Sequence, residues 1–297
     1  MNRLLAVLLG TSLLQLAAPT QREVVTALSS TLADGHVDEA MGKHLADVLH
    51  RKLDAGAFDL AATPEQFAAA ITDLLQLETK DVHLVLRYVG TSTQGTAAAQ
   101  PAFTLPPMFT RTEVLAGNVG FMKVRHFMGT NQEIDDAMAK LSGVSALVID
   151  LGDSLGGEPE LVQHFSSYLF EQRTHLLDML ARGEAQPVER WTSEVPGQRF
   201  PNVRVYVLTS SRTFSAAESF AFGLQATKRA VIVGETTRGG GHFTTNKRLT
   251  QGFALVLPIG RAYDPRTGKG WQGTGVQPDV NVPYAIALKA AIEHLHS

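Results

Sequence analysis

The sequence predicts an α/β protein in which an N-terminal helical bundle is followed by a layered α/β core. Residues 20–77 carry apolar side chains at helical spacing. From Val119 onward, short apolar strands alternate with helices, which favours a layered α/β arrangement. No repeat recurs at a fixed period, so a solenoid is excluded.

Three helices are expected in the bundle. Two sets of apolar residues spaced four apart are separated by a break at Gly35, and a second break follows at Gly56. The third helix is predicted to begin after Thr63, because threonine is a good N-cap and Pro64 suits the first helical position. Gln66 lies three residues after the cap, which completes the signature of a helix start.

The remaining elements follow from apolar runs and their period. A strand is expected at His83–Tyr88, and residues 90–107, rich in Thr, Ala, Gly and Pro, are interpreted as a linker or exposed loop. Further strands are predicted at 119–124, 146–151, 203–208, 230–233 and 253–258. Helices are predicted at 131–141, 160–170, 215–226 and 284–295, the last after a long loop at 260–278.

Composition limits the classes of function. A net charge of −3 without a basic cluster argues against a nucleic-acid partner. The absence of cysteine excludes disulfides, thiolate catalysis and Cys-ligated metals. The histidines at 36, 44 and 50 lack the spacing of a metal motif, so no metal or cofactor is expected.

The first 18 residues are typical of a secretory signal peptide. Arg3 supplies a positive charge, Leu4–Leu16 an apolar run, and Ala17 and Ala18 a small-residue cleavage site. The alternative interpretation is an amphipathic first helix. No other stretch is long and apolar enough to span a bilayer. The signal-peptide pattern predicts that the protein is exported, to the periplasm or outside the cell.

Ser215 lies between a predicted buried strand, Val203–Leu208, and a predicted helix. Hydrolases place a nucleophilic serine at such a turn, where free N–H groups gather at the helix N-terminus. The alternative is that Ser215 only caps the helix, because Ser215 and Glu218 have the S-x-x-E spacing of a capping box.

Three unusual loops follow predicted strands: GDSLGGE after Leu151, SSRTFS after Leu208 and GETTRGGGH after Val233. In open α/β sheets, sites lie at the carboxyl ends of strands. An oxyanion hole would need two N–H donors near the nucleophile, and the candidates are the amide of Ala216 and that of Gly156 or Gly157. A plain tight turn would also account for the glycine pair.

A nucleophilic serine needs a base to accept its proton. Among the ten histidines, His83 follows Asp81 at the start of a strand, and His242 follows three glycines. Composition and spacing alone do not decide between His83 and His242.

Five blocks in order resemble the C-terminal processing (tail-specific) serine protease family. The blocks are LETKDVHLVLRY, NVGFMKVRHF, LVIDLGDSLGG, LTSSRTFSAAESFAFGLQATKRAVIVGETTRGGGH and LPIGRAYDPRTGKGWQGTGVQPDVNV. The resemblance is strongest to the PDZ-less branch, with interphotoreceptor retinoid-binding protein and tricorn-like peptidases. It implies a core of the ClpP/crotonase-like kind. Together with the signal-peptide and helical patterns, it predicts three regions: signal peptide 1–18, helical domain 19–80 and peptidase-like core 81–297.

The resemblance also implies roles for single residues. Ser215 matches the family nucleophile, and the oxyanion donors match the Gly156–Gly157 turn and the Ala216 amide. Members with a catalytic lysine carry it in a segment like GEKT, but Thr236 holds that position here. Tricorn-like members take a histidine from an early strand, which makes His83 the expected base.

Two departures from the family pattern bear on activity. Tricorn-like members carry a Glu before the G-x-G-V-x-P-D block, whereas this chain has Gln272, which accepts a hydrogen bond but stabilises an imidazolium less well. The family's D-L-R-x-N-x-G-G strand end has lost its Arg and Asn, which are Gly152 and Ser154 here.

The sequence therefore predicts a secreted serine-type peptidase, a hydrolase that cleaves peptide or protein substrates through an acyl-enzyme on Ser215, with His83 as the general base. The alternative is a non-catalytic binding protein that holds a hydrophobic ligand, such as a retinoid or fatty acid, or a peptide on the same fold. No prediction is made of the oligomeric state.

Overall fold

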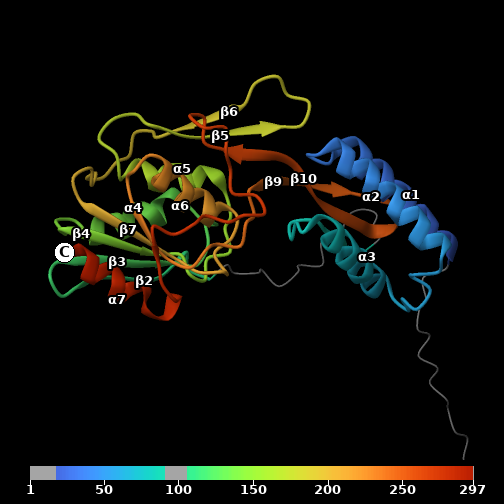
Figure 1. Ribbon diagram of the computed structural model, residues 1–297, viewed down its shortest axis with the longest axis horizontal. Helices are drawn as coiled ribbons and strands as arrows, with labels where there is room; N and C mark the ends of the chain where they lie inside the picture. Colours follow the sequence, from blue (N-terminus) through green and yellow to red (C-terminus); the bar gives the residue numbers. More distant parts are fainter. Residues whose placement is uncertain (1–17, 91–105, 297) are drawn as a thin grey trace, which may run out of the picture. The chain divides into compact units, whose positions relative to one another are not determined.

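The structure is a computed structural model that describes residues 18–90 and 106–296 (Figure 1). The predicted signal peptide and the predicted linker at 90–107 fall almost entirely outside the described residues. The chain forms two compact units. The first contains the described parts of Met1–Gln94 with Thr245–Pro258, and the second those of Gly95–Thr244 with Ile259–Ser297. The predicted domain boundary at residue 80 stays a prediction.

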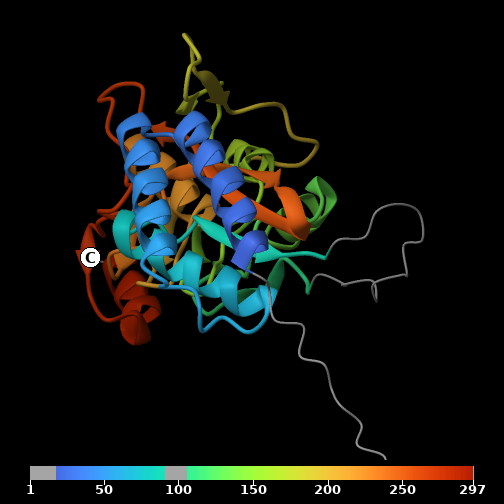
Figure 2. The ribbon, with the colours of Figure 1, turned by 90° about the vertical axis from the view of Figure 1, so that its right-hand side faces the viewer.

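Three helices begin the first unit, as the sequence predicts. They are α1 (Ala18–Gly35), α2 (Glu39–Asp54) and α3 (Pro64–Thr79). α1 and α2 lie side by side (Figure 2), and Gly42 of α2 has no room for a β-carbon, which would meet the Leu32 carbonyl of α1. α3 begins as expected, because the Thr63 hydroxyl accepts a hydrogen bond from the Gln66 N–H at 3.2 Å.

A small antiparallel sheet completes the first unit. β1 (Val85–Tyr88) pairs with the first part of β10 (Phe253–Tyr263), with Val85 opposite Val256 and Tyr88 opposite Phe253. The fully buried Phe67 of α3 packs edge-on against Phe253, with ring centroids 5.8 Å apart. β9 (His242–Arg248), which spans the boundary between the units, also pairs with β10, and the 3₁₀ turn η1 (Thr250–Gly252) joins the two strands.

The second unit is built on a six-stranded sheet with the order β11-β8-β7-β4-β3-β2. Its strands are β2 (Phe109–Leu115), β3 (Val119–Val124), β4 (Ala146–Asp150), β7 (Arg204–Thr209), β8 (Val231–Gly234) and β11 (Val280–Asn281). All neighbours are parallel except β2, which is antiparallel to β3. The carboxyl ends of β4, β7 and β8 therefore meet at one edge of the sheet.

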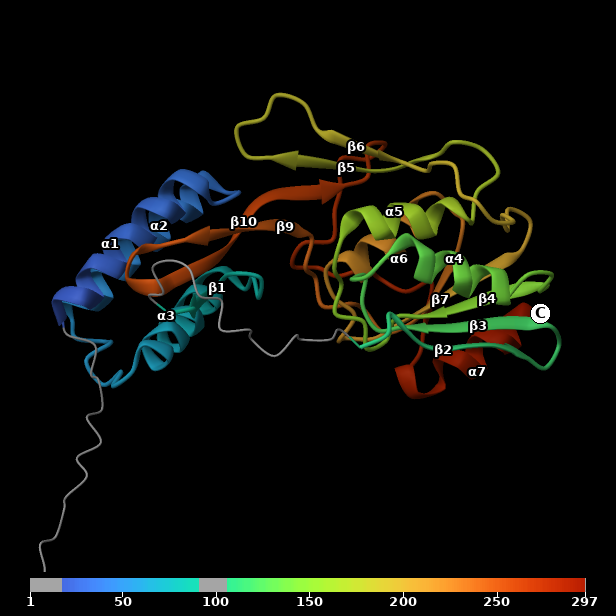
Figure 3. The same cartoon turned by 180° about the vertical axis from the view of Figure 1, so that it is seen from behind.

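Helices cover both faces of this sheet (Figure 3). The helices are α4 (Asn131–Lys140), α5 (Pro159–Ser167), α6 (Ala216–Ala226) and α7 (Tyr284–Leu295). In β4, Leu147 and Ile149 belong to the hydrophobic cluster under α4, α5 and α6, whereas Ala146 and Val148 belong to the cluster under α7. The two-residue period of a strand thus supplies both clusters, and the predicted layered α/β core is confirmed.

A hairpin that the sequence did not predict extends the second unit. β5 (His175–Ala181) pairs with β6 (Val188–Trp191) and with the second part of β10, where Gly260 lies opposite Ala181. None of the helices in the described residues is both long and apolar enough to cross a membrane.

Candidate active site

The loops that follow β4 and β7 are joined to each other by hydrogen bonds. The Ser210 hydroxyl donates to the Gly152 carbonyl at 2.5 Å, and the Phe214 N–H donates to the Ser154 carbonyl at 3.1 Å. Such bonds fix one loop against the other. The turn at Ser215 and the Gly156–Gly157 turn are therefore held as one structure.

Ser215 has a backbone conformation that is rare for a residue with a side chain. Its φ is 56° and its ψ is −121°, and it directly precedes α6. A conformation of this kind costs about 1–3 kcal/mol and persists only where the surroundings impose it. A strained serine between a strand and a helix is the geometry of a nucleophile elbow.

Gly156 lies directly against the Ser215 turn. A β-carbon on Gly156 would come within 2.8 Å of the Ser215 β-carbon, the Ala216 nitrogen and the Phe214 oxygen, and the φ of Gly156 is +86°. Only glycine fits there. The structure thus brings three predicted site residues together: Ser215, Ala216 and Gly156.

Gly157 is held by a short parallel bridge to Phe127. The Phe127 N–H donates to the Gly156 carbonyl at 2.7 Å, and the Glu158 N–H donates to the Phe127 carbonyl at 2.6 Å. The bridge uses the groups on either side of Gly157, so it does not engage the Gly157 N–H. This arrangement suits an amide that serves as an oxyanion donor.

Glu218 connects the Ser215 turn to the glycine-rich loop after β8. Its side chain is fully buried, and one oxygen accepts from the Ser215 N–H at 2.8 Å and the Gly240 N–H at 2.7 Å. The other oxygen accepts from the Thr237 hydroxyl at 2.5 Å and the Gly239 N–H at 2.6 Å. The S-x-x-E spacing read from the sequence therefore serves tertiary structure as well as the helix end.

Burial raises the pKa of the Glu218 carboxyl, and the hydrogen bonds from Thr237, Gly239, Gly240 and Ser215 oppose that rise. The four donors offset part of the cost of removing the carboxylate from water. Glu218 is thus a positioning residue, since it holds the backbone of the predicted nucleophile.

Gln272 also binds the glycine-rich loop. Its side-chain oxygen accepts from the Gly241 N–H at 2.7 Å and from the His242 N–H at 3.0 Å. The contacts of this side-chain oxygen are therefore with main chain, and they fix the path of the loop into β9. A neutral amide makes these two bonds as a carboxylate would.

His83, the predicted base, lies in the first unit, in the turn before β1. Its Nδ1 is 3.0 Å from Asp81 Oδ1, and its backbone N–H donates to the same oxygen at 2.9 Å. The side chain of Asp81 is only 3% exposed. A carboxylate on Nδ1 orients an imidazole and selects the tautomer in which Nε2 accepts a proton.

Tyr284 occupies the space beside Gly152, where the family pattern has an arginine. A β-carbon on Gly152 would collide with the Tyr284 ring. The Tyr284 hydroxyl donates to the buried Asp150 carboxylate at 2.9 Å, and burial together with the charge of Asp150 raises the pKa of Tyr284 to about 12. Lys123 lies 3.2 Å from the same hydroxyl. The strand end is thus supported from α7 rather than by an arginine of its own loop.

Within the described residues, no group of three or more His, Asp or Glu side chains could hold a metal ion.

The sequence profile of peptidase family S41 matches residues 118–282, from β3 through β11. The chain belongs to this family. The matched range contains the Ser215 turn, the glycine pair, Glu218 and Gln272.

Two relatives extend this result. Carboxyl-terminal-processing peptidase 1 from the chloroplast of Arabidopsis thaliana is 30% identical over 173 residues, which cover 56% of this chain and 34% of that protein. Carboxy-terminal processing protease CtpA of Bacillus subtilis is 24% identical over 180 residues, which cover 60% of this chain and 38% of CtpA. The similarity thus spans little more than a third of either relative.

A solved structure of the photosystem II D1 C-terminal processing protease shares the S41 fold with this chain. It aligns with a TM-score of 0.58 at 16% identity and covers 94% of this chain and 98% of that one. At this identity the likeness establishes the fold alone. The resemblance to the C-terminal processing family that the sequence predicts is confirmed by the profile and the relatives.

The predicted site residues therefore divide into two groups. Ser215, Ala216 and Gly156 meet at one turn, and Gln272 holds the neighbouring glycine-rich loop, all within the second unit. His83 belongs to the first unit, where it is oriented by Asp81. Sequence reasoning recognised Glu218 as a helix cap and missed its bonds to the glycine-rich loop.

Proposed function

We propose that this S41 chain is a serine peptidase in which Ser215 is the nucleophile. The observation that carries the proposal is the strained backbone of Ser215, held against Gly156 at the N-terminus of α6. A strained turn that presents a hydroxyl beside paired amides is suited to acyl transfer. Family membership supports a peptide bond as the scissile group.

The proposed reaction proceeds in two stages. The Ser215 oxygen attacks the peptide carbonyl while His83 Nε2 accepts the hydroxyl proton, and the amides of Gly157 and Ala216 donate to the resulting oxyanion. The imidazolium then protonates the leaving amine, the C–N bond breaks, and an acyl ester remains on Ser215. A water molecule, deprotonated by the same imidazole, attacks the ester, which releases the acid and restores the serine.

In the proposed reaction, Gln272 is a positioning residue that holds the loop from Gly241 to His242. Asp81 orients His83 and stabilises the imidazolium that forms.

The binding-protein alternative is less well supported, because the S41 profile is that of a peptidase. Export to the periplasm or beyond is proposed from the composition of residues 1–18 alone.

A fluorophosphonate probe followed by peptide mass spectrometry tests the proposal. The expected adduct lies on Ser215, is absent in Ser215→Ala, and forms at least 100-fold more slowly in His83→Ala. His242→Ala is the matched control, with labelling close to that of the unmodified protein. Labelling lost in His242→Ala and kept in His83→Ala would transfer the role of base to His242. A folded protein without any adduct on Ser215 would refute the hydrolase.

A further inference from the structure

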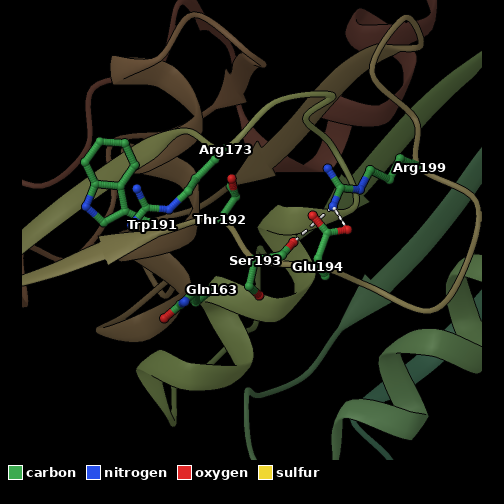
Figure 4. Close-up of a pocket in the computed structure, with 7 residues that line it drawn as sticks. All are labelled: Gln163, Arg173, Trp191, Thr192, Ser193, Glu194 and Arg199. Atoms are coloured by element: carbon green, nitrogen blue, oxygen red, sulfur yellow. Dashed lines mark hydrogen bonds and ion pairs between the residues drawn. The ribbon is translucent and has the colours of Figure 1, made fainter.

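A polar pocket of about 370 Å³ lies beside the end of β6, apart from the residues of the proposed reaction (Figure 4). It belongs to the second unit. The lining residues are Gln163, Arg173, Trp191, Thr192, Ser193, Glu194 and Arg199. Two guanidinium groups and one carboxylate therefore face a single pocket.

Arg173 is the distinctive group of this pocket. Its guanidinium carbon lies 4.2 Å from the centre of the Trp191 ring, and the residue is exposed. Among the described residues Arg173 forms no ion pair. Stacking on an aromatic face uses the plane of a guanidinium and leaves its N–H edge available to a planar anion.

Arg199, on the opposite side of the pocket, is already engaged by the protein. It donates to the Glu194 carboxylate at 2.8 Å, to the Glu171 carbonyl at 2.9 Å and to the Ser193 carbonyl at 3.3 Å. Figure 4 shows this group on one side of Ser193, with Arg173 extended toward the indole on the other. The hydrogen bonds of Arg199 are thus used within the protein. The N–H groups of Arg173 are available to a ligand.

The indole that supports Arg173 is itself fixed. Its N–H donates to Glu189 at 2.8 Å, and its ring stacks on His175 with centroids 4.4 Å apart and an angle of 11°. A binding group that is ordered before the ligand arrives loses less entropy when the ligand binds.

The floor of the pocket is also ordered. The Ser193 N–H donates to the Ser167 hydroxyl at 2.9 Å, and that hydroxyl donates to the Gln163 carbonyl at 2.7 Å. Thr192 is buried, and its hydroxyl accepts from the Thr174 N–H at 2.8 Å. The side chains of Gln163 and Ser193 remain at the pocket surface as hydrogen-bonding groups.

We propose that this pocket binds a single carboxylate of a peptide, with Arg173 as the bidentate partner. Glu194 is paired with Arg199, so Arg173 is, among the described residues, the lining cation without a carboxylate partner, and one carboxylate would pair with it. The planar fork of an arginine matches a carboxylate with two parallel hydrogen bonds. The proposal rests on the peptidase assignment only in taking the carboxylate to belong to a peptide. That carboxylate can be an Asp or Glu side chain or a chain end.

Binding to the Ser215→Ala protein tests this independently of any cleavage. The chain has two tryptophans, so a ¹⁵N-labelled sample gives two indole N–H signals, which Trp191→Phe assigns. Three N-acetylated alanine peptides of equal length serve as probes. One has an internal Glu and an amidated end, one a free carboxyl end, and one an amidated end with no charge.

The chemical shift of the Trp191 indole N–H should change with added charged peptide until binding is saturated, and it should not change with the neutral peptide. The chemical shift of the Trp271 indole N–H should not change with any of the peptides. Arg173→Gln should weaken binding about tenfold, and 0.5 M salt should weaken it as well. Arg248→Gln, which removes an exposed arginine of β9, is the control with the same loss of charge and should bind normally.

The two charged peptides distinguish the source of the carboxylate. Stronger binding of the Glu peptide identifies a side chain, and stronger binding of the free-acid peptide identifies a chain end. Equal binding of the neutral peptide, or unchanged affinity in Arg173→Gln, would overturn the proposal. Displacement by inorganic phosphate at lower concentration than by acetate would overturn the choice of a carboxylate. A failure of Ser215 labelling would leave these results unaffected.

Discussion

The α-carbon of Gly156 lies so close to the turn at Ser215 that a β-carbon there would come within 2.8 Å of the Ser215 β-carbon. The two residues come from loops after different strands, β4 and β7, which are neighbours in the sheet. Their proximity places the amides near Gly156 beside the predicted nucleophile. The close approach is thus part of the geometry that the proposed acyl transfer needs.

Gly156→Ala should lower kcat/KM by about 100-fold, which is the effect of losing one oxyanion donor. The added methyl group would push the glycine turn away from Ala216. Gly183→Ala is the matched control, because Gly183 has a φ of +83°, close to the +86° of Gly156, but open space where its β-carbon would lie. Both variants carry backbone strain, and only Gly156→Ala should lose activity in a peptide-cleavage assay. Equal losses would show that strain alone is responsible.

Glu218→Gln should lower both activity and stability. Either orientation of the amide turns an NH₂ group toward a buried backbone N–H: that of Gly239 on one side, or those of Ser215 and Gly240 on the other. An unpaired buried N–H costs about 1–3 kcal/mol. We expect urea unfolding to show a loss of that size and kcat to fall more than KM changes.

The control for Glu218 is Glu235→Gln. Glu235 also accepts from two backbone N–H groups, those of Tyr284 and Ser211, but at a solvent-accessible position where water can replace them. Its kcat should stay near that of the unmodified protein. A large kcat loss in both variants would mean that Glu218 has no special connection to Ser215.

The sequence predicted the elements whose pattern is local. The strands of 119–124, 146–151 and 203–208 are mostly apolar and mostly buried, and the helix start at Thr63 has its own cap. The turn at Ser215 was also predicted, because a buried strand and a helix flank it. These features depend on residues close together in the chain.

Elements that depend on distant partners were missed or misjudged. The sequence predicted a strand at 253–258 and a loop from residue 260, but β10 continues to Tyr263. Pro258 lies between Val256, the last residue paired with β1, and Gly260, the first paired with β5, so its missing N–H falls outside both of these ladders. β5 and β6 were missed because their pairing, and not their pattern, makes them strands.

The site shows the same limit. Glu218 accepts hydrogen bonds from Gly239 and Gly240, which lie more than 20 residues later. The S-x-x-E spacing does not predict these bonds. Tyr284 fills the space over Gly152 from 132 residues away in the chain. Sequence reasoning recognised that Gly152 replaces the family's arginine. It could not predict that a distant side chain, Tyr284, would support the strand end instead.

Gly152→Arg, which restores the family residue, should destabilise this chain by about 1–3 kcal/mol because the Tyr284 ring occupies the space. Tyr284→Ala removes the ring, so the double variant should lose less free energy of unfolding than the sum of the single losses. Tyr284→Phe keeps the ring and should give no such relief. Strict additivity with Tyr284→Ala would show that the ring does not exclude the arginine.

Asp153 makes stability depend on pH in the acid range. The hydrogen bond from Lys123, at 2.7 Å, and the one from Arg212, at 2.6 Å, outweigh burial and lower the pKa of Asp153 below its ordinary 3.8. Because the folded pKa is the lower one, this stabilisation is present above pH 3.8 and is lost as pH falls through the folded pKa. Asp153→Asn should therefore lower the urea midpoint at pH 7, and the gap to the unmodified protein should narrow below pH 4. Asp47→Asn, at an exposed position of α2, should leave the midpoint unchanged across this range. A gap that stays constant with pH would mean that Asp153 stabilises the fold by packing and not by its charge.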